Sequence, residues 1–187
     1  MSKEKRELRR SIKKETKELT KENRWNLVLG ELLISAGSET CVLAGPFQLG
    51  LVNFSLKTVR GEEKNTGDLF SGFSNRFGKS VGLFFLQLLY LCLWTMLFYI
   101  PGIIKSYSYA MSYYILQDNP ELGPKEAITK SRQMMKGHKW ELFVMQLSFI
   151  GWILLSIITC GIVAFFFVAP WMNLAYAKFY DSIKDKE

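Results

Sequence analysis

Three long apolar blocks, separated by basic segments, dominate the hydrophobic pattern of the chain. The last block, residues 142–177, runs for 36 residues without a charged side chain. A soluble helix keeps a polar face, and one membrane span needs only about 20 residues. The block therefore predicts two short membrane helices, Leu142 to Thr159 and Ile162 to about Tyr180, with a turn at Thr159-Cys160-Gly161.

The middle block, residues 80–117, contains Lys105 as its only charged residue in 38 positions. One helix of that length would extend about 57 Å, nearly twice the hydrocarbon core of a bilayer. The chain is therefore expected to fold back, either at Ile100-Pro101-Gly102 or nearer Leu91-Cys92, in which case Pro101 would kink the return helix. The pattern leaves both positions open.

The first block, residues 25–57, is the least regular. Its first leg, Trp25 to Ala36, is too short to span a bilayer and includes Glu31. Residues 37–40 are typical of a turn, and Cys41 to Leu56 forms the returning segment. The first leg is therefore a half-span, a re-entrant segment or a helix packed inside the bundle.

The overall composition hides this segregation. The 187 residues are 49% hydrophobic and 22% charged with a net charge of +7, which resembles a slightly basic soluble domain. Residues 1–24 nevertheless hold 15 of the 41 charged side chains. The basic residues fall in four clusters, residues 3–24, 57–79, 125–139 and 178–186, and the positive-inside rule places all four in the cytoplasm.

Together these patterns predict an all-α, polytopic integral membrane bundle built as three helical hairpins. The hairpins cover about residues 25–57, 80–117 and 140–180 and supply about six short or partial spans. Residues 58–79 and 118–139 form cytoplasmic loops, and both termini, a charged arm of residues 1–24 and a tail of residues 182–187, are cytoplasmic. No cleavable signal peptide is expected, because the first apolar segment follows 24 highly charged residues.

The second cytoplasmic loop has the pattern of an amphipathic helix. Pro124 fits the first helical turn and Gly137 fits the end, with small and apolar residues at helical spacing between them. Such a helix lies along the inner face of the membrane or packs between the hairpins, and the two roles are compatible. Its inward positions are Ala127, Ile128, Ser131, Met134 and Met135, and the residues expected at anionic lipid headgroups are Lys125, Lys130, Arg132, Lys136, His138 and Lys139.

Each returning segment contains a proline with a polar residue within eight positions of it. Kinked helices at these prolines would turn free backbone groups toward a cavity or ligand, or the prolines only bend the bundle. Lys105 either snorkels to the outer interface or lies deep beside a partner such as Glu31. The expected kink residues are Pro46, Pro101 and Pro170, and the candidate ligand-binding residues are Glu31, Asn53, Lys105, Tyr109 and Asn173.

Several strings in the chain resemble a known family. They include Ile100-Pro101-Gly102-Ile103-Ile104-Lys105, Glu126-Ala127-Ile128-Thr129-Lys130-Ser131-Arg132 and Leu147-Ser148-Phe149-Ile150-Gly151-Trp152. These strings resemble the uncharacterised bacterial membrane proteins grouped as domain of unknown function 975 (DUF975), over roughly residues 25–181. The resemblance implies a polytopic protein of the bacterial plasma membrane, and the family brings no established activity.

The sequence contains no recognisable catalytic motif. His138 lacks partners at metal-ligand spacing, no Walker loop, nucleophile elbow or zinc-protease motif occurs, and Cys41, Cys92 and Cys160 are expected to be packing residues. We therefore expect a non-enzymatic protein without metal or cofactor.

The expected function is to bind or move a hydrophobic or amphipathic molecule, either a lipid or a membrane-active peptide, in transport, export or self-protection. The alternative is an assembly or regulatory subunit of a transporter or other membrane complex. The expected partners are the lipid bilayer with its anionic headgroups and a membrane protein or a second copy of the chain. Nucleic acid is not expected, because no stacking or groove-reading motif accompanies the positive charge.

Overall fold

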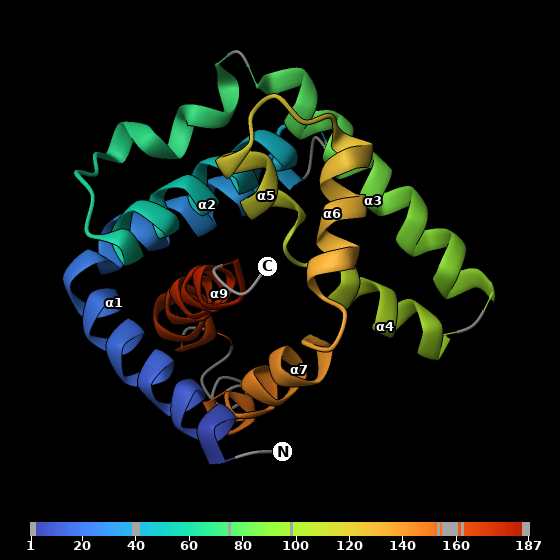
Figure 1. Cartoon of the computed structure of the whole chain (residues 1–187). Coiled ribbons are helices and arrows are strands. Elements are labelled where there is room, and N and C mark those ends of the chain that lie inside the picture. Colours follow the sequence, from blue (N-terminus) through green and yellow to red (C-terminus); the bar gives the residue numbers. More distant parts are fainter. Residues whose placement is uncertain are drawn as a thin grey trace.

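The computed structural model describes residues 3–38, 42–74, 76–97, 99–152, 154, 161 and 163–184 of the chain. All regular secondary structure in these residues is helical, which confirms the all-α prediction. Figure 1 shows the helices arranged as a ring around α9, which is viewed almost along its axis. The elements are α1 (Lys3–Ser38), α2 (Ala44–Arg60), the 3-10 helix η1 (Thr66–Phe73), α3 (Phe77–Leu97), α4 (Tyr99–Tyr109), α5 (Ser112–Asp118), α6 (Pro124–Met134), α7 (Lys139–Leu147), the π-helix η2 (Ala164–Val168) and α9 (Ala169–Lys184).

The helix α1 joins two segments that the sequence pattern separates. It runs without a break from Lys3 to Ser38, so the charged arm and the first apolar leg form one helix. The hydroxyls of the buried Thr16 and Thr20 donate hydrogen bonds to the carbonyls of Ile12 (2.7 Å) and Thr16 (2.6 Å). A threonine hydroxyl that donates to a carbonyl of its own helix can be buried without a partner on another element. The face of α1 that carries these threonines therefore packs against α9.

The helix α2 is enclosed by its neighbours, and its glycines let η1 approach its backbone. A Cβ atom at Gly50 would lie 1.8 Å from the carbonyl oxygen of Leu69, and one at Gly72 would lie 2.1 Å from that of Pro46. Backbones can approach this closely only where side chains are absent. The returning leg of the first hairpin is thus a core helix of the protein.

The helices α3 and α4 form a hairpin that projects from one side of the ring (Figure 1). The helix α3 ends at Leu97 and α4 begins at Tyr99, nearer to the predicted turn at Ile100-Pro101-Gly102 than to the alternative at Leu91-Cys92, and Cys92 lies within α3, where it is exposed. Large apolar side chains cover the outer face of the pair: Phe85, Leu88, Leu89, Leu93, Trp94, Met96, Ile100, Ile103 and Ile104 are all exposed.

One helix in the described part of the chain, α3 over Phe77–Met96, is long and apolar enough to cross a membrane. The helices α2 and α9 have 17 and 16 residues, fewer than the roughly 20 that a span needs, and α1 carries charges along much of its length. The six short or partial spans predicted from the sequence are therefore not confirmed.

The chain changes direction between α4 and α5, and Ser131 of α6 satisfies the backbone at this break. Its hydroxyl donates to the carbonyl of Ser108 (2.8 Å) and accepts from the backbone N–H of Met111 (3.2 Å). The prediction of an amphipathic α6 that begins at Pro124 is confirmed. Its apolar face packs against α3 and α5, so that face is covered by protein.

A cluster of charges ties the ends of α2, α5 and α9 together. The Arg60 guanidinium lies 2.8 Å from a carboxylate oxygen of Asp118 and 2.7 Å from one of Asp181. Lys184 lies 2.5 Å from Asp118, and the Tyr180 hydroxyl donates to the same carboxylate at 3.2 Å. These bonds join helices that are distant in sequence at the face of the ring where the chain ends.

Two of the three prolines expected to kink helices lie in the first turn of one, Pro46 in α2 and Pro101 in α4, whereas Pro170 of α9 follows the π-helix η2 in a continuous helical run. A first-turn proline loses no helical hydrogen bond, because the N–H at that position has no partner within the helix. Pro46 and Pro101 therefore begin helices and do not kink them. The predicted outer turn at Thr159 and Cys160 lies outside the described residues, and α7 ends at Leu147.

Candidate functional site

The first turn of α9 is fixed against α1 by Trp171. The indole N–H of Trp171 donates to the carbonyl of Lys13 (3.2 Å) and the hydroxyl oxygen of Thr16 (3.1 Å). The ring of Phe149 packs edge-on against the indole, with 4.8 Å between the ring centroids. Trp171 is thereby held in one orientation, and one of its faces lines a cavity between α1 and the C-terminal helices.

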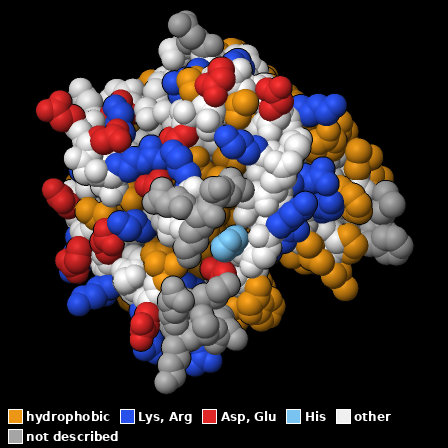
Figure 2. Space-filling view, viewed as in Figure 1, with side chains coloured by type: hydrophobic (Ala, Val, Ile, Leu, Met, Phe, Trp, Pro, Cys, Tyr) orange, Lys and Arg blue, Asp and Glu red, His pale blue; other side chains and the backbone are white. Residues whose placement is uncertain are grey.

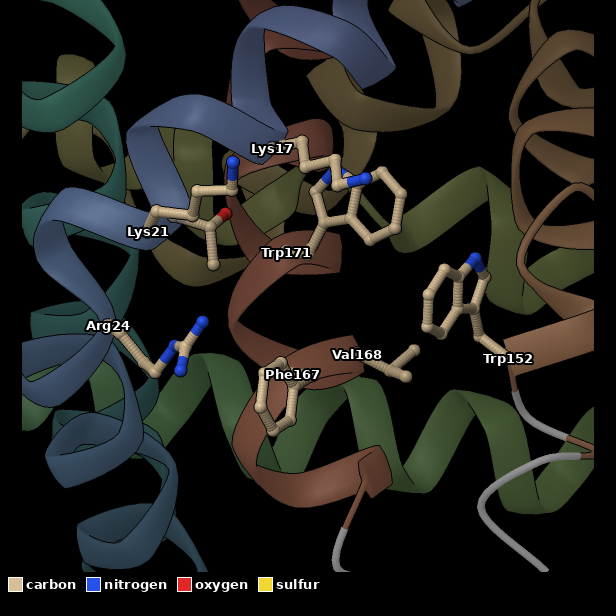
Figure 3. Close-up of a pocket in the computed structure, with 8 residues that line it drawn as sticks. Lys17, Lys21, Arg24, Trp152, Phe167, Val168 and Trp171 are labelled. Atoms are coloured by element: carbon tan, nitrogen blue, oxygen red, sulfur yellow. The ribbon is translucent and has the colours of Figure 1, made fainter.

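A π-helical turn, η2, sets the second wall of this cavity. Pro170 has no N–H, and its ring would clash with the carbonyl of Phe166 four residues earlier in a regular α-helix. The N–H of Ala169 instead donates to the carbonyl of Ala164, five residues earlier. This wider turn places Phe167 and Val168 on the wall next to Trp171 (Figure 3).

The cavity has a volume of about 260 Å³ and two chemically different sides. Figure 3 shows the long basic side chains of α1 on one side and the rings of Trp152, Phe167 and Trp171 on the other. The lining residues are Lys17, Thr20, Lys21 and Arg24 from α1, and Trp152, Phe167, Val168 and Trp171 from the C-terminal segments.

The basic side chains lean toward the aromatic wall. The guanidinium carbon of Arg24 lies 4.3 Å from the centroid of the Phe167 ring, and the ammonium of Lys17 lies 5.8 Å from that of Trp171. Lys21 is paired with Glu18 at 3.2 Å. The Nε atom of Arg24 is buried and has no hydrogen-bond partner among the described residues. A buried guanidinium nitrogen without an acceptor is costly, and a bound anion would satisfy it.

Lys13 extends the positive charge one turn beyond the cavity. Its ammonium lies 4.2 Å from the centroid of the Phe149 ring and donates to the carbonyl of Ser148 at 2.9 Å. Burial lowers the pKa of the Lys13 side chain from its ordinary value. The aromatic rings and the carbonyl stabilise the charged form of Lys13, so it adds to the positive potential of this region.

The predicted ligand-binding residues occupy other parts of the molecule. Glu31 of α1 accepts a hydrogen bond directly from the side-chain amide of Asn173 of α9. The amide of Asn53 donates to the Ser71 hydroxyl (2.9 Å) and its oxygen accepts from Gln117 (2.7 Å). The pairing of Glu31 with Asn173 bonds α1 to α9, and the Asn53 bonds join α2 to η1 and α5.

Lys105 and Tyr109 lie on α4, at the projecting hairpin. The Lys105 ammonium lies 4.4 Å from the centroid of the Trp94 ring, and Tyr109 is buried with its carbonyl accepting from the Gln87 amide at 3.0 Å. No hydrogen bond among the described residues links Lys105 to Asn53, Glu31 or Asn173. The structure therefore does not bring the five predicted residues into one site.

The basic residues predicted to contact lipid headgroups at the inner membrane face fall into two groups, one on or just after α6 and one at the start of α7. Lys125, Arg132 and Lys136 are exposed on or just after α6, opposite its buried face. Lys139 and Trp140 begin α7, and His138 lies before it with Nδ1 3.4 Å from the Glu141 carboxylate. Among the described residues no group of three His, Cys, Asp or Glu side chains is placed to hold a metal ion.

Sequence reasoning missed the cavity because its two walls are more than 120 residues apart in the chain. The basic residues Lys17, Lys21 and Arg24 were interpreted only as part of a charged arm. One signal was available: Lys17, Lys21 and Arg24 follow one another at steps of four and three residues, which places them on one face of a helix.

Comparison with protein families supports the resemblance noted above. The model of the family described as "Protein of unknown function (DUF975)" matches residues 96–187 of the chain. This region contains α4 to α9 and the aromatic wall of the cavity. Comparisons with curated proteins and with solved structures gave no match.

Proposed function

Because the chain belongs to the DUF975 family, whose description assigns no activity, we propose a function from the structure: the protein is a membrane protein that binds an anionic amphiphile. The cavity between α1 and α9 receives the apolar chain against Phe167, Trp152 and Trp171. The anionic group binds Arg24 and its neighbouring lysines. The observation that carries this proposal is the buried, unpartnered Nε of Arg24 beside an aromatic wall.

The exposed apolar surface supports a membrane location. The helix α3 has 21 residues, and a helix of that length extends about 31 Å, close to the thickness of the hydrocarbon core. Its outer face carries Leu89 and Met96, which are 53% and 85% exposed. An apolar face of this size in water would promote aggregation, whereas lipid would cover it. We therefore place the α3–α4 hairpin in the bilayer and the charged face of the ring in the cytoplasm.

The chemistry of the cavity walls supports the choice of ligand. An aliphatic chain gains free energy by leaving water for the aromatic wall. A carboxylate or phosphate accepts charge-assisted hydrogen bonds from a guanidinium, which are about twice as strong as neutral ones. The protein would bind or move such a molecule without converting it chemically, and this role needs no catalytic group.

A spin-labelled fatty acid can test this proposal. The full chain in non-ionic detergent is titrated with doxyl stearic acid and, separately, with its uncharged methyl ester, and the immobilised fraction is measured by electron paramagnetic resonance. We expect the acid to bind the wild-type protein about tenfold more tightly than the ester, because only the acid pairs with Arg24. In the Arg24→Gln variant this preference should disappear.

The Arg6→Gln variant is the matched control. Arg6 is an exposed residue of the same helix and does not line the cavity. We expect Arg6→Gln to keep the preference for the acid. Equal binding of acid and ester by the wild-type protein would contradict the proposal, as would an unchanged preference in Arg24→Gln. A membrane-active peptide that displaces the acid would identify the competing ligand class.

A further inference from the structure

A second cleft, separate from the cavity at α1, lies where α4 and α7 meet. It has a volume of about 220 Å³. The helix α4 packs against both α6 and α7, and the cleft lies between α4 and the first turns of α7. The lining residues are Ile103, Ile104, Tyr107, Lys139, Trp140 and Phe143.

The walls of this cleft are aromatic and aliphatic. Phe143 packs edge-on against Tyr107 with 6.0 Å between ring centroids, and its ring is tilted by 31° to that of Trp140 with 5.2 Å between centroids. The Tyr107 hydroxyl donates to the side-chain oxygen of Gln146, which holds its ring against α7. Trp140 is 64% exposed at the edge of the cleft, in the manner of tryptophans at the level of lipid headgroups.

Lys139 at the start of α7 lines the cleft, and two further cations, Lys105 of α4 and Arg132 of α6, come from the elements that pack around it. The charges of Arg132 and Lys139 both repel the charge on Lys105. No carboxylate of the described residues forms an ion pair with any of the three. Such a concentration of unpaired positive charge attracts an anion.

The cleft lies next to the exposed apolar surface of the α3–α4 hairpin. Figure 2 shows basic side chains on the border between the white, polar face of the ring and the orange hairpin. Ile103 and Ile104 belong both to the cleft and to the exposed apolar face of α4. The cleft is therefore continuous with the surface that lipid chains would cover, and Lys139 forms part of its lining.

From this geometry we propose that the cleft binds one membrane phospholipid with an anionic headgroup. The phosphate of the lipid is held by Lys105, Arg132 and Lys139, and one acyl chain lies along Ile103 and Ile104. The apolar part of the cleft distinguishes a phospholipid from free phosphate, which would gain nothing from it. This site is distinct from the cavity at Arg24 and has different residues.

Native mass spectrometry of the full chain in mild detergent tests this site. Equal amounts of phosphatidylglycerol and phosphatidylcholine with identical acyl chains are added, and the bound lipids are counted. We expect the wild-type protein to retain phosphatidylglycerol in preference to phosphatidylcholine by about tenfold, because only the former carries a net negative charge to pair with the cluster. The triple variant Lys105→Gln, Arg132→Gln, Lys139→Gln should hold one phosphatidylglycerol fewer than the wild-type protein, since the cavity at Arg24 is unchanged in it.

A second triple variant removes the same charge from elsewhere on and beside α6: Lys125→Gln, Lys130→Gln, Lys136→Gln. It should hold as much phosphatidylglycerol as the wild-type protein, and excess inorganic phosphate should not displace the lipid. Equal losses in the two triple variants would overturn the specific site in favour of diffuse attraction, and displacement by phosphate would overturn the choice of lipid. If the first triple variant lacks helical circular dichroism, Lys139→Gln alone decides between the same outcomes.

Discussion

Single glycines decide how closely the core of this protein packs. At Gly50 an added Cβ atom would meet the Leu69 carbonyl oxygen at 1.8 Å, and that atom belongs to backbone that cannot swing aside. We expect Gly50→Ala to lower the free energy of unfolding by about 2–3 kcal/mol, as overpacking of a core does. Thermal unfolding followed by circular dichroism in detergent should show a midpoint lowered by about 5–10 °C.

Gly78 is the control for this prediction. It also lies in a helix, α3, but nothing lies within 4 Å of the Cβ atom that alanine would add. Gly78→Ala should leave the midpoint unchanged or raise it slightly, because alanine is the better helix former. A Gly50→Ala protein that unfolds at the wild-type temperature would show that η1 and α2 are not in close contact.

The sequence alone could not separate these two glycines. Both lie in apolar or weakly polar segments, and the difference between them is a contact with a backbone oxygen 19 residues away. The same limit applies to Thr16 and Thr20, two polar residues of the charged arm that the structure buries. Their hydroxyls bond to the carbonyls four residues earlier, so burial costs them no hydrogen bond.

At the scale of elements, Asp118 joins α5 to α2 and α9. Burial alone would raise the pKa of Asp118, but hydrogen bonds from Arg60 and Lys184 outweigh it and lower the pKa below the ordinary value. The folded state therefore binds the proton less readily than the unfolded state. The resulting stability is complete above the ordinary aspartate pKa of about 4 and is lost as the pH falls through the lower folded pKa.

Replacing Asp118 with Asn should remove this contribution. We expect Asp118→Asn to be less stable than wild type by about 1–2 kcal/mol at pH 7, between the values of exposed and fully buried ion pairs. The difference should shrink as the pH falls below about 4, because the wild-type carboxylate is then protonated too. Urea unfolding at several pH values measures both effects.

Glu18→Gln provides the comparison for Asp118→Asn, because its ion pair with Lys21 is exposed. It should change stability by less than about 0.5 kcal/mol at either pH. Equal stability of Asp118→Asn and wild type at pH 7 would show that the cluster does not hold the three helices together.

Helices could be predicted where the residues that determine their ends and their buried face lie close together in the sequence. The helix α6 was predicted with its first turn and its buried face because Pro124 and the apolar spacing lie within one short segment. The charged arm and the first apolar segment, which the sequence divides at residue 24, form one continuous helix. The hydrophobicity changes there, but nothing in the local backbone breaks the helix, so α1 continues to Ser38.

At the scale of the whole molecule, the three consecutive hairpins become a ring around α9 (Figure 1). Bonds from α9 reach α1 through Trp171 and Asn173, and reach α2 through Asp181. Every one of these contacts joins residues more than 100 positions apart, so no local pattern could reveal them. The walls of the cavity are also distant in sequence, whereas the apolar hairpin α3–α4 was visible in the hydrophobicity of the chain.

The proposed membrane location of that hairpin predicts a protected face. Leu89 is 53% exposed, so only lipid could shield a cysteine there, whereas Glu63 is exposed in the loop before η1. With the three native cysteines replaced by serine, Leu89→Cys should resist a water-soluble maleimide in membrane vesicles opened on both sides, and Glu63→Cys should react.

In sealed vesicles Glu63→Cys should react only when the cytoplasmic face is outward. Both should react in sodium dodecyl sulfate. If Leu89→Cys reacts in opened vesicles as fast as Glu63→Cys, the apolar face of α3 lies in water, and the hairpin does not anchor the protein.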